Sequence, residues 1–217
     1  MPPATVPPPH GGWAVLVPVK RLDGAKSRLS TRTAGVRRDL SLAFALDTVA
    51  AALAAPGVAA VHVVTDDARV AEAVAAVGAH VVDDSSGGGL NDALRLAESV
   101  VRAAGAGAVA ALAGDLPALR HDQLGRALAD AAAHARAFVP DAAGTGTTLL
   151  CAAAGTALDP RFGVRSCAAH AASGAVRLVT ADCAGLRRDV DTEVDLWDAQ
   201  RLGTGPATRA VLGTGNG

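Results

Sequence analysis

Short apolar runs that alternate with alanine-rich helical segments are the feature that most constrains the fold of this chain. Apolar runs of strand length occur at 13–19, 58–65 and 108–113, and each is followed by turn residues and a segment of near-helical apolar spacing. Strands alternating with helices are typical of βαβ units, whose strands lie parallel. The pattern predicts an α/β protein, a three-layer α/β/α Rossmann-like sandwich with a mixed, mainly parallel sheet.

The remaining elements follow from the same patterns. We expect further strands at 80–82, 135–140, 147–153 and 176–180, and helices over 35–55, from the turn after 65 to about 77, over 91–104 and 120–133, from about 164 and from about 192. Alanine suits both structures, so these bounds hold only to a few residues.

One domain is expected over 13–203. The chain has 217 residues, and 50% of them are hydrophobic, which is enough for a single sizeable core. The proline-rich segment 1–12 is predicted to be a disordered N-terminal extension, and 204–217 a flexible C-terminal tail.

Composition excludes several classes of function. A net charge of −1 and 2% aromatic residues provide no basic groove or stacking platform for nucleic acid. No apolar stretch reaches the about 20 residues of a membrane helix. The 3 cysteines form neither a CxxC pair nor a metal-spaced set with histidines. We therefore expect a cytoplasmic protein with reduced cysteines, whose partners are small molecules.

Both lysines of the chain, Lys20 and Lys26, lie with Arg21 and Arg28 directly after the first predicted strand. In open parallel sheets, ligands bind where the carboxyl ends of strands meet. A compact ammonium suits a crowded phosphate, so this loop is a candidate phosphate-binding wall. A solvated basic turn is the alternative. The segment matches neither a Walker loop nor a dinucleotide fingerprint.

Carboxylates follow other predicted strands. Asp115 comes directly after the apolar run at 108–113, and Asp189 and Asp191 occupy alternate positions that share one side of an extended backbone. Their mutual repulsion favours a cation, and with the lysines nearby the set suits Mg²⁺ held against phosphate oxygens. The alternatives are an Asx turn at Asp115 and a helix N-cap at Asp191.

Three glycine-containing segments complete the candidate site. The loop 87–89 precedes Asn91 and could approach a nucleotide base or ribose, although a flexible loop with an Asn N-cap explains it equally. The segments 144–148 and 162–166 combine glycine with hydroxyl residues, and Ser166 could meet an anion there, although ordinary turns are the alternative.

The ordered set VPVKRLDGAKSRL, GGGLN, GDLP, GTGTTLL, FGVRS and DVDT resembles the guanylyltransferases of deazaflavin cofactor (coenzyme F-420) biosynthesis, which act on phosphoenolpyruvate or 2-phospho-L-lactate. The resemblance covers roughly 13–200. It implies the glycosyltransferase-A-like fold of nucleotide-diphospho-sugar transferases, which is similar to that of molybdopterin guanylyltransferases.

The resemblance also implies roles for individual residues. It implies that GTP is contacted by Lys20, Lys26, Gly89, Asn91 and Gly114, that Mg²⁺ is held by Asp115, Asp189 and Asp191, and that the phosphorylated acid is bound by Thr148, Gly163 and Ser166. Lys20, Lys26 and Asp115 are the expected catalytic residues. Relatives often have proline and then a small or acidic residue where this chain has Val164 and Arg165, which bears on the fit of the acid.

The implied reaction is transfer of GMP from GTP to phosphoenolpyruvate, giving enolpyruvoyl-2-diphospho-5'-guanosine and pyrophosphate. A phosphate monoester, with a second pKa of about 6, is already largely ionised at neutral pH and needs no general base. The histidines agree with this, since His62 and His170 lie in no nucleophile motif and are interpreted as packed or solvated.

Alternatives remain at this stage. They are the same transfer to 2-phospho-L-lactate, 3-phosphoglycerate or a molybdopterin, a non-catalytic GTP-binding regulatory protein, and a Rossmann-like interaction domain. The family leads us to expect transient handover of the product to a downstream transferase. The oligomeric state is open, with a homodimer as one option.

Overall fold

The computed structural model describes residues 11–22, 26, 28, 29, 31–84, 87–178 and 182–214. Residues 1–10 of the predicted extension lie outside these ranges. In chain order the elements are β1 (Trp13–Pro18), α1 (Ala34–Leu53), β2 (Val58–Thr65), α2 (Ala68–Ala76), β3 (His80–Asp83), α3 (Leu90–Ala103), β4 (Ala108–Leu112), α4 (His121–Ala131), β5 (Arg136–Pro140), β6 (Thr147–Ala152), α5 (Ser166–Ala172), β7 (Val176–Arg177), α6 (Ala184–Arg187), α7 (Glu193–Leu202) and α8 (Pro206–Thr214).

The strands form one mixed sheet. Within the described residues it has 7 strands in the order β3-β2-β1-β4-β6-β5-β7. β1 pairs in parallel with β2 and β4, as do β2 with β3 and β5 with β7, whereas β6 is antiparallel to both β4 and β5. The predicted mixed, mainly parallel sheet is confirmed.

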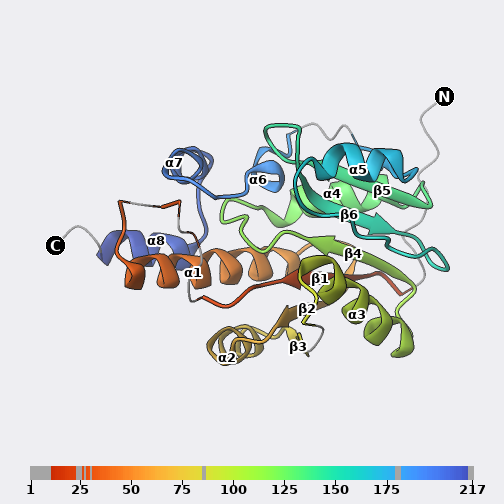
Figure 1. Ribbon diagram of the computed structural model, residues 1–217, viewed down its shortest axis with the longest axis horizontal. Helices are drawn as coiled ribbons and strands as arrows, with labels where there is room; N and C mark the ends of the chain where they lie inside the picture. The colour runs from red at the N-terminus through yellow and green to blue at the C-terminus, as the bar shows by residue number, and fades with distance from the viewer. Residues whose placement is uncertain are drawn as a thin grey trace.

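Helices cover both faces of this sheet (Figure 1). One core cluster joins alternate residues of β1, β2 and β4 to α1, α2 and α4, and a second joins the intervening residues to α3 and α5. Because β1 and β4 are covered on both sides, their runs are apolar throughout, which is why the sequence showed them so clearly. The three-layer prediction is therefore confirmed.

The C-terminal residues correct one prediction. Residues 206–214 are not a flexible tail but helix α8, which packs beside α1 (Figure 1). The buried carboxylate of Asp47, in α1, accepts the backbone N–H groups of Ala207 and Thr208 at 2.9 Å each. Asp47 thereby satisfies the first amides of α8 from a position about 160 residues earlier in the chain.

Other element bounds differ modestly from expectation. α5 begins at Ser166 rather than near 164, because 163–165 form a turn. β7 covers only Val176–Arg177, and 179–180 of the predicted strand lie outside the described residues. The short helix α6 was not predicted. No described helix is both long and apolar enough to cross a membrane.

Because β6 runs antiparallel to β4, the loop before β6 lies at the edge of the sheet where β1 and β4 end. β1 and β4 end at this edge, and antiparallel β6 begins there, with the N–H of Ala113 donating to the carbonyl of Thr148 at 2.8 Å. The turn between β5 and β6, at 141–146, therefore lies beside the loops that leave β1 and β4. These loops form the rim of the candidate site.

Candidate active site

The main cavity lies where β1 and β4 end. There the chain leaves two adjacent strands toward opposite ends of the sheet, from β1 to β2 and from β4 to β5, as is typical of ligand sites in open α/β folds. Its volume is about 1080 Å³, at the upper end of the range for small-molecule sites. Most of the residues singled out in the sequence line it, namely Lys20, Lys26, Gly114, Asp115, Gly163, Ser166, Asp189 and Asp191.

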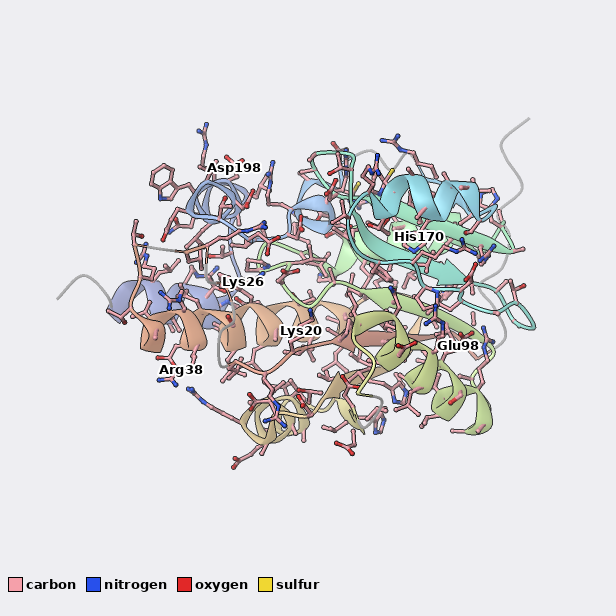
Figure 2. All side chains as sticks on the ribbon, in the orientation of Figure 1. Lys20, Lys26, Arg38, Glu98, His170 and Asp198 are labelled. Atoms are coloured by element: carbon pink, nitrogen blue, oxygen red, sulfur yellow. The ribbon has the colours of Figure 1, made fainter. Side chains whose placement is uncertain are left out.

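The loop after β1 contributes cations of two kinds. The side chain of Lys20 is exposed at the cavity, whereas that of Lys26 is only 12% exposed (Figure 2). Arg21 also lines the cavity, but its guanidinium pairs with Asp66 at 2.6 Å. The two lysines thus present one solvated and one enclosed ammonium to the same space.

Lys26 bridges two of the predicted metal ligands. Its ammonium contacts the carboxylate of Asp115 and lies 3.1 Å from Oδ1 of Asp191. Burial by itself lowers the pKa of Lys26, but the two carboxylates outweigh burial, so the pKa lies above its ordinary value. The lysine is therefore held as a cation between Asp115, which follows β4, and Asp191, which lies between α6 and α7.

A backbone hydrogen bond brings the three aspartates together. The N–H of Val190 donates to the carbonyl of Asp115 at 3.1 Å, and the side chain of Val190 is fully buried. With Val190 in the core, Asp189 and Asp191 lie on the cavity side, as their alternate spacing predicted. Helix α7 has Thr192 as its N-cap, so Asp191 does not serve as the cap.

The carboxyl group of Asp189 is partly buried beside the other two. Burial, followed by the charges of Asp115 and Asp191, raises its pKa to about 7, and Asp141 adds to this effect. Negative charge is therefore crowded in this part of the cavity. A cation would relieve the repulsion.

The donor chemistry of this cluster fits Mg²⁺, which prefers carboxylate oxygens. The ammonium of Lys26 already spans two of the three carboxylates, so the site accepts positive charge. Among the described residues, however, no three acidic, histidine or cysteine side chains converge closely enough to ligate an ion as they stand. Magnesium binding by Asp115, Asp189 and Asp191 stays a prediction.

Gly114 allows the ends of β1 and β4 to approach each other. A Cβ atom at this position would lie 2.8 Å from the carbonyl oxygen of Pro18 and 3.2 Å from a methyl group of Val19. A side chain would push the two loops apart. Gly114 is thus required by close packing at the cavity floor, whether or not it contacts a nucleotide.

The acid-binding residues predicted from the resemblance are only partly brought together. Gly163 lines the cavity with φ +136°, and Ser166, the first residue of α5, lines it with 2% of its surface exposed. Thr148 does not line the cavity, and its buried hydroxyl has no hydrogen-bond partner among the described residues. The neighbouring Thr147 lines the wall instead.

The glycine loop contributes less than expected to the lining. Gly89 and Asn91 are not among the residues that line the cavity, although Leu90 is. The carboxamide of Asn91 binds the backbone of Phe162, accepting its N–H at 2.8 Å and donating to its carbonyl at 2.9 Å. Nucleotide contact by Gly89 and Asn91 therefore stays a prediction, while Asn91 has a second, observed role.

Sequence reasoning brought 144–148 to the candidate site but not the start of the turn between β5 and β6. Its Asp141 lines the cavity and accepts the N–H groups of Thr145 at 2.9 Å and Gly146 at 2.8 Å. An aspartate before an AAGTG turn at the end of an apolar run was an available signal. It was not used because β6 was not known to run antiparallel and begin at this edge.

Comparisons with known proteins agree with this geometry. Residues 13–213 match the family described as guanylyl transferase CofC like. The chain is 58% identical over 201 residues to the phosphoenolpyruvate guanylyltransferase of Streptomyces coelicolor, covering 92% of this chain and 95% of the relative. It is 54% identical over 207 residues to the protein of the same name from Geodermatophilus obscurus, covering 93% and 94%. The chain belongs to the CofC-like guanylyltransferase family.

The fold of this family member is also found at much lower identity. A crystal structure of a candidate nucleotide-diphospho-sugar transferase from Desulfovibrio desulfuricans superposes with a TM-score of 0.69 at 20% identity, covering 92% of this chain and 93% of that chain. This likeness shows the fold alone, which is the nucleotide-diphospho-sugar transferase type expected from the sequence.

Proposed function

We propose that the protein transfers GMP from GTP to phosphoenolpyruvate, forming enolpyruvoyl-2-diphospho-5'-guanosine and releasing pyrophosphate. The observation that carries this proposal is the convergence of two lysines, the carboxylates of Asp115, Asp189 and Asp191, and the turn at 163–166 on one cavity. The relatives named phosphoenolpyruvate guanylyltransferase support the choice of acceptor.

In the proposed reaction an oxygen of the acid's phosphate attacks the α-phosphorus of GTP. A bond from that oxygen to phosphorus forms, the bond to the bridging oxygen of pyrophosphate breaks, and pyrophosphate leaves with the electron pair. Because the nucleophile is already ionised, the protein has to align two polyanions and stabilise the departing charge. Charged side chains and a bound cation can supply this, and a general base is unnecessary.

The lysines serve the triphosphate in this proposal. The exposed ammonium of Lys20 meets the phosphates as they enter, and that of Lys26 supports the leaving pyrophosphate. Asp115, Asp189 and Asp191 would hold Mg²⁺, which when bound neutralises phosphate charge. Gly114 keeps the loops carrying these groups in contact.

The acid is proposed to bind at the opposite wall. Gly163 and Ser166 line the cavity there, and Arg165 adds positive charge. Thr148 lies one residue behind the lining residue Thr147, so its proposed contact with the acid requires a local adjustment. Gly89 and Asn91 are proposed to lie near the nucleoside.

We also propose the cellular setting. The product would enter coenzyme F-420 biosynthesis in the cytoplasm. A labile diphosphate favours direct handover to the transferase that consumes it, and a homodimer is compatible with the single domain.

The decisive experiment is to measure pyrophosphate release by the purified protein with Mg²⁺ and GTP, in parallel with phosphoenolpyruvate, 2-phospho-L-lactate, 3-phosphoglycerate or no acid. Release only with phosphoenolpyruvate is expected, with the guanylylated acid identified by mass spectrometry. Release only with another acid would reassign the acceptor. GTP binding without release in any mixture would favour the non-catalytic, GTP-binding alternative.

A further inference from the structure

One hydrogen bond closes the turn that forms the proposed acid-binding wall, from the N–H of Ser166 to the carbonyl of Gly163 at 3.1 Å. Gly163 has φ +136° and Arg165 has φ +57°, so two of its residues occupy regions of backbone space that are rarely populated by ordinary residues. The side chain of Val164 between them is 96% exposed and packs on nothing that could fix the backbone. The position of the turn in the cavity wall therefore depends on the residues that flank it.

Asn91 anchors the residue directly before the turn. Its carboxamide makes both available hydrogen bonds to the peptide groups of Phe162, at 2.8 Å to the N–H and 2.9 Å to the carbonyl. Asn91 lies in the first turn of α3, next to the glycine loop. This pair of bonds therefore joins the glycine loop side of the cavity to the acid side.

His170 anchors the next residue upstream. Its ring is fully buried in α5, and Nε2 accepts the N–H of Arg161 at 3.0 Å (Figure 2). Because Nε2 is an acceptor, we assign the proton of the neutral ring to Nδ1, which donates to the hydroxyl of Thr147 at 2.9 Å. The edge of the Phe162 ring packs on the imidazole with centroids 5.0 Å apart.

We infer that Asn91 and His170 are positioning residues, which hold the turn at 163–166 in the conformation that binds the phosphorylated acid. This inference rests on the proposed function for the identity of the acid. His170 also holds Thr147, a lining residue, so one buried ring fixes two parts of the same wall. Neither anchor touches the reacting atoms in this role.

The test uses two variants that each keep one of the two hydrogen bonds made by the imidazole. His170→Gln places an amide oxygen near the position of Nε2 and can still accept the N–H of Arg161. His170→Asn places an amide nitrogen near Nδ1 and keeps the Thr147 contact but loses the Arg161 anchor. Both variants remove the ring and its packing, so their comparison separates the anchor from general destabilisation.

We expect His170→Asn to raise KM for phosphoenolpyruvate about tenfold while KM for GTP changes by less than about twofold, since only the acid wall is displaced. His170→Gln keeps the Arg161 anchor and loses only the Thr147 contact, so it is expected to raise KM for the acid less than His170→Asn does, with KM for GTP unchanged. Equal KM values for the acid in both variants would overturn the inference, because a purely structural histidine would not distinguish them.

Hydrogen exchange provides a readout that does not depend on activity. Well below the melting temperature, the amide of Arg161 should exchange about tenfold faster in His170→Asn than in His170→Gln. Unchanged exchange would overturn the anchor. Wild-type protein without acid-dependent release would overturn the proposed function and the acid as the occupant of this turn, whereas exchange would still decide whether His170 holds it.

Asn91→Ala tests the second anchor and separates it from the predicted nucleoside contact. Loss of the anchor should raise KM for the acid and speed exchange of the Phe162 amide. A rise in KM for GTP alone, with unchanged exchange at Phe162, would instead assign Asn91 to the nucleotide and remove it from the inference.

Discussion

The ammonium of Lys26 lies 3.1 Å from Oδ1 of Asp191, and the same nitrogen contacts Asp115. The lysine proposed to serve the triphosphate is thus paired with two of the carboxylates proposed to hold Mg²⁺. While Lys26 is paired with these carboxylates, it cannot bind the triphosphate and they cannot bind the metal ion. Binding of nucleotide and metal should therefore exchange the partners of Lys26, with the carboxylates passing from the ammonium to the ion.

If Lys26 exchanges partners in this way, removing its charge should have opposite effects on catalysis and on metal affinity. Lys26→Gln should reduce kcat/KM for GTP about 100-fold, because it removes a cation from the leaving group. The same variant should bind Mn²⁺ more tightly than the wild type when no nucleotide is present, since the ammonium no longer competes. Mn²⁺ binding can be followed by electron paramagnetic resonance, with Arg201→Gln on exposed α7 as the control. Equal Mn²⁺ affinity in wild type and Lys26→Gln would contradict the competition.

Asp115→Asn should separate catalysis from folding. Its carboxylate is partly exposed and contacts Lys26, so the amide keeps the shape but loses the charge proposed to bind metal. We expect turnover to fall about 100-fold or more, with a melting temperature close to that of the wild type. Asp39→Asn is the matched control, because Asp39 forms an exposed ion pair with Arg69 at 2.8 Å and is not among the cavity-lining residues. Unchanged turnover in Asp115→Asn would remove it as a ligand.

His170 should make the stability of the protein depend on pH. Burial is the main reason that its pKa is lowered to about 4; Arg161 and Arg136 add to this effect, and Asp159 opposes it. The unfolded chain, with a histidine pKa of about 6.5, therefore binds the proton more readily than the folded one. The stabilising contribution is complete above about pH 6.5 and is lost as the pH falls towards 4, by about 3 kcal/mol in total.

Urea unfolding of wild type and His170→Gln at pH 7.5, 6 and 5 measures this effect. The difference between the two proteins cancels the titration of the carboxylates that they share. Wild type should lose more stability than His170→Gln on acidification. Parallel curves would show that His170 does not titrate as the structure implies.

The link between Asp47 and α8 should be a major stabilising contact. Asp47→Ala leaves the amides of Ala207, which is partly buried, and Thr208, which is buried, without their acceptor and should lower the free energy of unfolding by about 1–3 kcal/mol. Gly205→Ala should also destabilise, because a Cβ atom there would lie 2.3 Å from the carboxyl carbon of Asp47. Gly213→Ala is the control, since nothing lies within 4 Å of a Cβ at that position. Stability equal to the wild type in Asp47→Ala would contradict the capping role.

Local patterns were sufficient wherever a residue's role depends on its near neighbours. β1 and β4 are buried on both faces, so continuous apolar runs marked them. Asp67, directly after β2, caps α2 by accepting the N–H groups of Arg69 and Val70, a role that depends on near neighbours alone. The alternate spacing of Asp189 and Asp191 placed both on one side of the backbone, because extended chains alternate.

Contacts between segments that are distant in the chain could not be predicted in the same way. The segment 204–217 looks like a tail because its anchor, Asp47, is remote in the chain. Asp141 lines the cavity because β6 runs antiparallel to β4 and begins at the edge of the sheet where β4 ends. The sequence singled out Asn91, but only the fold shows that its carboxamide binds Phe162, 71 residues away.

The sequence by itself determined the alternation of strands and helices, the family and the residue types that gather at the ends of the strands, because hydrophobic periodicity and short motifs are local properties. Only the tertiary structure decided that Lys20 is exposed while Lys26 is enclosed between Asp115 and Asp191, and that Thr147 rather than Thr148 lines the wall. Burial and charge pairing depend on which distant segments the sheet brings together, and no local pattern encodes that choice.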